Sequence, residues 1–268
     1  MRIVVIGGTG LIGAKLVTVL RGMGQAVISA SRSSGVDVFT GAGLPAALAD
    51  ADAVIDVTNP PGRSDGGAEE FFVASATNLL AAERAAGVSH HIGLSIVGAD
   101  RVHTSGYFRA KAAQEAIVAE GDVPFSILRS TQFFEFADDI ADWNTAEDTV
   151  RLPDTAVRPV ASDDVVTALV SIARETPIMG TAEIAGPEEV ALDEFVRKVL
   201  LTHHDERYVV RDVLSRPYGF NIEGQLLAPD VDATLTQTTL AEWLQNRTVA
   251  QPPIGRHAAS FSFSDSNR

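Results

Sequence analysis

The sequence predicts an α/β fold: a doubly wound parallel sheet with helices on both faces, followed by a small C-terminal lobe. The first observation is that short apolar runs alternate with longer amphipathic stretches up to about residue 130, which is typical of parallel sheets. The second is that residues 3–6 and 53–57 are almost continuously apolar, as in strands buried on both faces. After residue 130 the pattern loosens, which favours a lobe over further sheet repeats.

The strands expected in the first half are residues 2–6, 26–31, 36–40, 53–58, 91–96 and 125–129. The helices expected between them are residues 11–22, 44–48, 68–86 and 106–119. Later we expect a strand at 182–185 and helices at 131–141, 165–173 (after an N-cap at 162–164), 192–201 and 239–244. We therefore predict a first domain over residues 1–150, to which residues 159–187 return, a substrate lobe mainly over 151–250, and a flexible tail at 251–268.

Composition excludes several classes of function. The formal net charge of −14 opposes binding to nucleic acids and to anionic membranes, both of which need basic residues. No apolar run is long enough to span a bilayer, and no signal peptide is evident, so we expect a cytoplasmic protein. The chain has no cysteine for a thiolate metal site, and adjacent His90 and His91 should point to opposite faces of a strand. We therefore expect no metal.

A glycine-rich loop follows the first expected strand. Gly7, Gly10 and Gly13 form the pattern G-x-x-G-x-x-G at the start of the first expected helix. Such glycines permit a tight turn, a close approach of backbone amides to a pyrophosphate, and packing of helix on strand. The alternative is an ordinary strand–helix turn. The context predicts a Rossmann-type domain that binds a dinucleotide through Gly7, Thr9, Gly10, Leu11 and Ile12.

The end of the second expected strand indicates which dinucleotide binds. The stretch SASRSSG, residues 29–35, has no acidic residue to accept a hydrogen bond from a ribose 2′-hydroxyl. Arg32 can instead pair with a 2′-phosphate, and Ser31, Ser33 or Ser34 can add hydroxyl donors. We therefore predict NADP(H) rather than NAD(H). The alternative is that Arg32 is an exposed loop arginine.

Two further groups of residues are expected at the ligand crevice, which lies at the carboxyl ends of parallel strands. Thr58, Asn59 and Pro60 follow the strand at 53–58 and should border a ribose of the cofactor, unless they form a plain turn. The second group is a tyrosine–lysine pair with a serine.

Tyr107 and Lys111 are four residues apart, which places both on one face of a helix. A nearby ammonium lowers the pKa of a tyrosine, so that the tyrosine can act as a general acid toward a carbonyl that accepts hydride. Lys111 could also bond the ribose of the nicotinamide, and Ser95, at the end of an expected strand, could polarise the carbonyl. The alternative is a solvated helix face.

The set of motifs GGTGLIG, SASRSSG, SGYFRAKAAQEAI and PFSILRSTQFFEF resembles the NmrA-like, atypical branch of the short-chain dehydrogenase/reductase superfamily. The resemblance covers roughly residues 1–245 and implies a Rossmann domain, a small substrate lobe and NADP(H). Lys111 matches a lysine of isoflavone-reductase-like members. Tyr107 adds the tyrosine that many NmrA-like proteins lack. Ser95 lies closer to the tyrosine than is usual in the superfamily.

The resemblance also places residues 129–136 beside nicotinamide and substrate. It implies that Thr131 and Gln132 bond the substrate and that Phe133 forms a wall of the pocket, whereas Phe136 is expected in the core. The leading hypothesis is an NADPH-dependent reductase of a carbonyl, enone or quinone-like small molecule. The alternatives are a noncatalytic NADP(H) sensor and an epimerase or dehydratase with tightly held cofactor. The sequence leaves the substrate unidentified and a homo-oligomer open.

Overall fold

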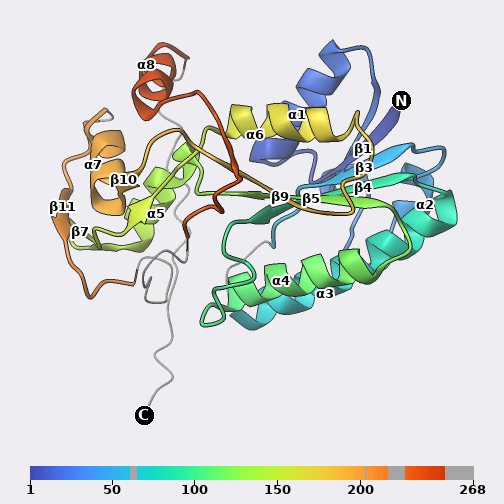
Figure 1. Ribbon diagram of the computed structural model, residues 1–268, viewed down its shortest axis with the longest axis horizontal. Helices are drawn as coiled ribbons and strands as arrows, with labels where there is room; N and C mark the ends of the chain where they lie inside the picture. Colours follow the sequence, from blue (N-terminus) through green and yellow to red (C-terminus); the bar gives the residue numbers. More distant parts are fainter. Residues whose placement is uncertain (61–64, 203, 217–226, 251–268) are drawn as a thin grey trace.

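The computed structural model describes residues 1–60, 65–202, 204–216 and 227–250, so the tail predicted at 251–268 lies outside the described residues. Its main feature is a sheet of seven described strands in the order β12-β9-β5-β4-β3-β1-β2, all paired in parallel (Figure 1). The strands are β1 (Arg2–Ile6), β2 (Ala26–Ala30), β3 (Ala53–Asp56), β4 (His90–Ile96), β5 (Phe125–Ser130), β9 (Gly180–Ala185) and β12 (Thr234–Leu235). The predicted α/β class is confirmed.

Helices cover both faces of this sheet (Figure 1). The helices on one face are α1 (Leu11–Gly22) and α6 (Ser162–Ile172), and those on the other are α2 (Leu44–Ala47), α3 (Asp65–Ala86) and α4 (Gly106–Glu120). Successive residues of β1 point to opposite faces, so Ile3 packs in one apolar core and Val4 in the other. Burial on both sides explains why this strand has no polar alternation.

The strand predicted at 36–40 is wrong. A short 3₁₀ helix, η1 (Arg32–Ser34), follows β2 instead, and Asp37 forms only an isolated bridge with Ala42. Val36 and Val38 are apolar because both are buried in a core cluster. Packing, rather than strand pairing, therefore accounts for the apolar pattern, and β2 forms an edge of the described sheet.

The helix predicted at 131–141 begins later than expected. Val160 donates its N–H to the carbonyl of Gln132 (2.8 Å), and Phe134 donates to the carbonyl of Val160 (2.9 Å). This strand-like pairing holds the first residues extended. The chain then forms η2 (Phe134–Phe136) and α5 (Ala137–Trp143).

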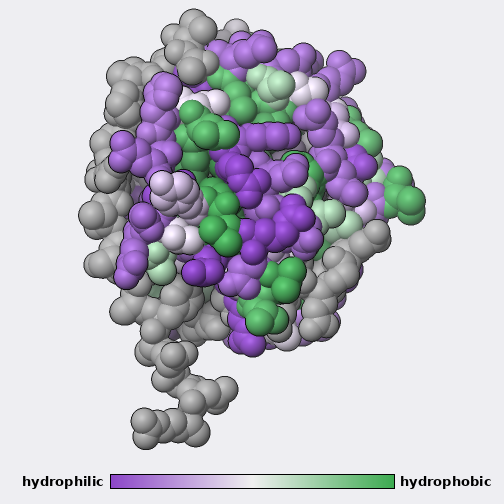
Figure 2. Space-filling view, turned by 90° about the vertical axis from the view of Figure 1, so that its left-hand side faces the viewer, coloured by the Kyte–Doolittle hydropathy of each residue, from purple (hydrophilic) through white to green (hydrophobic). Residues whose placement is uncertain are grey.

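A smaller group of elements forms a lobe beside the carboxyl ends of the strands (Figure 1). It contains α5, β6 (Thr145–Ala146), β7 (Thr149–Leu152), β8 (Ala156–Val157), β10 (Val190–Ala191), α7 (Leu192–Thr202), β11 (Tyr208–Arg211) and α8 (Leu240–Ala250). Its own apolar core is built around Phe134, Phe195 and Trp243. Figure 2, which views the molecule from this side, shows hydrophobic side chains in separate small groups among hydrophilic ones. None of the helices in the described part of the chain has the length and apolar character needed to cross a membrane.

Candidate active site

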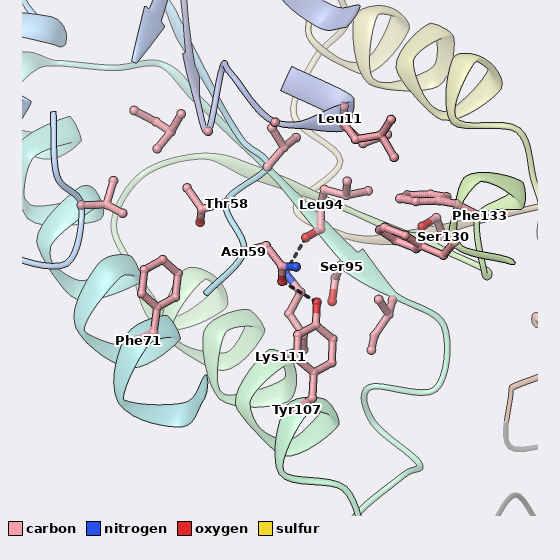
Figure 3. Close-up of a pocket in the computed structure, with 18 of the residues that line it drawn as sticks. Leu11, Thr58, Asn59, Phe71, Leu94, Ser95, Tyr107, Lys111, Ser130 and Phe133 are labelled. Atoms are coloured by element: carbon pink, nitrogen blue, oxygen red, sulfur yellow. Dashed lines mark hydrogen bonds between the residues drawn. The ribbon is translucent and has the colours of Figure 1, made fainter. Parts of the chain in front are cut away.

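A cleft of about 880 Å³ lies where the carboxyl ends of β1–β5 meet the lobe. Parts of the chain that are far apart in sequence line it, among them the glycine loop, the ends of β3 and β4, and the segment after β5. Figure 3 shows side chains from these parts directed into the same space. The arrangement follows from the parallel sheet, because the carboxyl ends of its strands share one edge.

Two glycines of the loop are required by the backbone itself. Gly7 has a φ of +80°, and its N–H donates to the carbonyl of Ala30 (2.9 Å), which ties the loop to β2. A Cβ on Gly13 would lie 2.1 Å from the carbonyl oxygen of Gly7, so only glycine allows α1 to pack this closely on the loop. A Cβ on Gly10 would lie 3.4 Å from the same oxygen, and the fold does not demand glycine there.

The N-terminus of α1 opens into the cleft. Its N-cap is Gly10, which has no side chain to cap the helix. The first turn contains no acidic residue. The N–H groups of the first turn have no partner within a helix, and the helix dipole adds positive character there. Thr9, Gly10, Leu11 and Ile12 all line the cleft. In a chain of net charge −14, this acid-free helix end suits the pyrophosphate of a dinucleotide.

Arg32 and its neighbouring serines lie at one end of the cleft. Arg32 is exposed and begins η1, while the hydroxyls of Ser31 and Ser33 lie 2.8 Å apart. All three residues line the cleft. The sequence reasoning missed Asp37, Phe39 and Phe71, which line the same end of the cleft without any recognisable motif.

The residues after β3 form the next part of the wall. Thr58 and Asn59 line the cleft, as expected. Pro60 is half-buried and is not among the residues that line it. Thr58 donates its N–H to Oδ1 of Asp56 (2.9 Å), which fixes the turn. The Thr58 hydroxyl oxygen is buried, and within the described part of the chain it has no hydrogen-bond partner. A ribose hydroxyl in the cleft would satisfy it.

Tyr107 and Lys111 both reach the cleft from the same face of α4, as the four-residue spacing predicts. The Tyr107 hydroxyl donates a hydrogen bond to Oδ1 of Asn59 (2.9 Å), as Figure 3 shows. The tyrosine ring packs edge-on against Phe72, with 5.8 Å between ring centroids. These two contacts, with the turn after β3 and with α3, hold the phenol in the wall of the cleft.

Lys111 lies deeper, with only 3% of its surface exposed. Its ammonium donates to the carbonyl of Leu94 (2.7 Å) and to Oε1 of Gln114 (2.8 Å), and lies 4.4 Å from the ring centre of Phe72. Burial lowers the pKa of Lys111 to about 8, although the negative charges of Asp56 and Glu115 oppose this change. The lysine therefore forms part of the floor of the cleft.

This burial gives a testable dependence of stability on pH. The folded chain releases the Lys111 proton from about pH 8, whereas an unfolded lysine keeps it up to its ordinary pKa of 10.5. Because the unfolded chain binds more protons between these values, the stability of the parent should rise with pH there, by up to about 3 kcal/mol relative to Lys111→Met. Urea unfolding of both proteins from pH 7.5 to 10.5 measures this difference. Parallel stability curves would contradict it.

Ser95, at the carboxyl end of β4, has an unsatisfied polar atom. Its side-chain oxygen is buried and has no hydrogen-bond partner among the described residues, although the residue lines the cleft. Figure 3 shows Ser95 and Tyr107 directed into the same part of the cleft. A buried hydroxyl without a partner is costly in a folded protein unless a ligand supplies the bond.

The segment after β5 lies at the lobe end of the cleft. Thr131, Gln132 and Phe133 line it, but the hydroxyl of Thr131 already donates to the carbonyl of Arg158 (2.5 Å). The rings of Phe133 and Phe136 lie 5.4 Å apart, and Phe136 lines the cleft as well as packing against the core. The sequence reasoning missed Trp143, Val157 and Arg158, which the lobe brings to this end.

No family model matches this chain, and no curated protein matches it either. Among solved structures, the chain is similar to MoeE5 in complex with UDP-glucose and NAD, with 17% identity, a TM-score of 0.68, and coverage of 93% of this chain and 100% of that one. It is also similar to a UDP-N-acetylglucosamine 4-epimerase from Bacillus cereus, with 17% identity, a TM-score of 0.66, and coverage of 95% and 98%.

A third similar structure is a dTDP-4-dehydrorhamnose reductase from Clostridium acetobutylicum, with 15% identity, a TM-score of 0.65, and coverage of 93% of each chain. At these identities the likeness shows the fold. The chain has the Rossmann fold, with the strand order and glycine loop described above.

Proposed function

We propose that this protein is an NADP(H)-dependent oxidoreductase that reduces a carbonyl, enone or quinone-like small molecule. The observation that carries the proposal is the joint placement of Tyr107, Lys111 and the unsatisfied Ser95 in the cleft that the open end of α1 also faces. Reduction of a carbonyl by hydride needs a proton donor, and a nearby cation and a hydroxyl donor stabilise the charge that develops on the oxygen.

The residues of the cleft divide this work by position. The first turn of α1 holds the pyrophosphate, and Arg32 pairs with the 2′-phosphate. When bound, the nicotinamide supplies the hydride. Tyr107 gives its hydroxyl proton to the substrate oxygen, Ser95 donates a hydrogen bond to the same oxygen, and the Lys111 ammonium stabilises the charge left on the tyrosine. The aromatic wall around Phe133 keeps water from the reacting atoms.

The comparisons support the cofactor class and the enzyme class. MoeE5 was solved with NAD, and the other two similar structures are a reductase and an epimerase. The motifs that resemble the NmrA-like branch support the preference for NADP(H). The epimerase likeness makes an epimerase with tightly held cofactor the second candidate. A noncatalytic NADP(H) sensor is the third, and the polar groups that converge near Tyr107 argue against it.

The test is NADPH oxidation, followed by absorbance, against a panel of quinones, enones, ketones and aldehydes. Turnover of one class supports the reductase. Nicotinamide that stays bound through purification, with no net NADPH consumption, would support the epimerase instead. NADPH binding without either result, together with a partner captured only in one redox state of the cofactor, would support the sensor.

Cofactor preference gives a separate prediction. Arg32→Ala should weaken NADPH binding by about 10–100-fold and leave NADH binding unchanged, because only the 2′-phosphate makes a charge-assisted bond to this side chain. Titration calorimetry with both nucleotides measures the two affinities. Arg84→Ala is the matched control, since Arg84 is an exposed arginine in the last turn of α3 that pairs with Asp122 and does not line the cleft. Equal losses for NADPH and NADH would refute the assignment.

A further inference from the structure

A chain of buried polar side chains runs beneath the cleft, from β3 to α4. Oδ2 of Asp56 accepts a hydrogen bond from Nε2 of Gln114 (3.0 Å), and Oε1 of Gln114 accepts one from the Lys111 ammonium (2.8 Å). All three residues are at most 5% exposed. Three polar side chains buried together in an apolar domain would be costly unless each is hydrogen-bonded, and here each one is.

The chemistry of Lys111 and Asp56 fixes the direction of the hydrogen bonds that join them through Gln114. Lysine ammonium can only donate hydrogen bonds, and an ionised carboxylate can only accept them. Gln114 must therefore turn its oxygen to Lys111 and its amide nitrogen to Asp56. Because the second carboxylate oxygen of Asp56 accepts the N–H of Thr58 (2.9 Å), the chain also connects to the turn that borders the cleft.

The other charged groups around Lys111 have partners of their own. Glu115 is bound by Arg129 through two hydrogen bonds, of 3.0 and 2.6 Å, which offset its charge. Glu83 and His91, from α3 and β4, form a buried pair at 2.9 Å that interacts electrostatically with Asp56. Asp56, by contrast, is joined to the lysine by the side-chain amide of Gln114 alone.

We propose that Asp56 and Gln114 are positioning residues that hold the Lys111 ammonium in the floor of the cleft that Tyr107 also lines, and keep it protonated. The consequence for catalysis rests on the function proposed above, whereas the effect on the lysine itself does not. The proposal rests on the fixed order of donors and acceptors from Lys111 through Gln114 to Asp56. This order places the Asp56 carboxylate where its negative charge stabilises the buried ammonium. Exchanging the anion and the amide between the two positions should preserve the order.

The experiment follows the titration of Lys111 directly. The chain contains three lysines, Lys15, Lys111 and Lys198, so protein labelled with ¹³C at lysine Cε gives three signals, which lysine-to-arginine variants assign. The Lys111 signal of the parent should titrate at about pH 8. Asp56→Asn replaces the carboxylate by an amide, which has only one acceptor oxygen. An N–H group of the new amide or of Gln114 must then face another N–H group or the Lys111 ammonium. The midpoint should therefore fall to about 7 or lower.

Two further variants make the result specific. In the double variant Asp56→Asn with Gln114→Glu, the introduced amide can accept from Thr58 and donate to the introduced carboxylate, which accepts from Lys111. The midpoint should return to at least that of the parent. Gln114→Met removes the link without changing charge, and its midpoint should also fall. Asp52→Asn is the matched control, because this exposed aspartate precedes the opposite end of β3 and should leave the midpoint unchanged.

If a substrate is found, the alkaline limb of kcat should move with the Lys111 midpoint in each variant. A purely structural role would lower thermal stability in the single variants but would not move this limb. The inference fails if the Lys111 midpoint is the same in Asp56→Asn and Gln114→Met as in the parent, or if the double variant does not recover it. If the midpoints move as expected but no acceptor is reduced, the positioning role stands and the reductase proposal fails.

Discussion

Tyr107→Phe is expected to lower turnover with NADPH by about 10²–10⁴-fold, the usual contribution of a general acid. The substitution removes one oxygen, the atom that would give its proton to the substrate. It leaves the ring packed against Phe72 and Phe108. The hydroxyl bond that is lost joins the tyrosine to Asn59, an exposed residue, so the fold should lose little stability. NADPH affinity should stay within about threefold of the parent.

The measurement needs binding and chemistry recorded separately. NADPH binding is followed by fluorescence, and one turnover of bound NADPH is followed by absorbance after mixing with the acceptor. Tyr208→Phe is the matched control, since Tyr208 lies on β11 in the lobe, is 67% exposed and does not line the cleft. Unchanged single turnover in Tyr107→Phe would remove this residue from the mechanism and direct attention to Ser95.

The sequence predicted the central part of the fold because the local signals and the packing agree there. Residues 11–22 were expected as a helix, and α1 has these bounds, since its apolar stripe faces the sheet and its ends are marked by glycine. At 36–40 the two disagree. Val36 and Val38 have the alternation of a strand, but Gly35, Gly41 and Gly43 at positive φ turn the chain back, so it packs without pairing as a strand.

In the candidate site, too, local signals predicted some features and packing determined the others. Local spacing was sufficient to predict that Tyr107 and Lys111 share a face, and strand alternation placed His90 and His91 on opposite faces. The latter is confirmed, because His90 contacts Ser126 (2.8 Å) and His91 contacts Glu83 (2.9 Å). No local pattern could join Asp56 to Gln114, which are 58 positions apart. This contact depends on how β3 and α4 pack against each other, which the local sequence motifs do not indicate.

Gly13→Ala is expected to destabilise the protein by about 3 kcal/mol and to weaken NADPH binding with it. The added methyl carbon would lie 2.1 Å from the carbonyl oxygen of Gly7 and 2.7 Å from Cα of Gly8. Both are backbone atoms, which cannot move aside as a flexible side chain can. Helix α1 must therefore shift away from the loop, and its first turn moves with it.

Thermal unfolding and NADPH titration of the same variant test this argument. We expect the melting temperature to fall by about 6–12 °C. Gly22→Ala is the matched control in the same helix, because a Cβ there meets no atom of the described residues within 4 Å. Alanine should leave stability unchanged or raise it by up to about 1 kcal/mol. If both variants bound NADPH and melted like the parent, the close packing of α1 on the loop would not be what holds the dinucleotide site in shape.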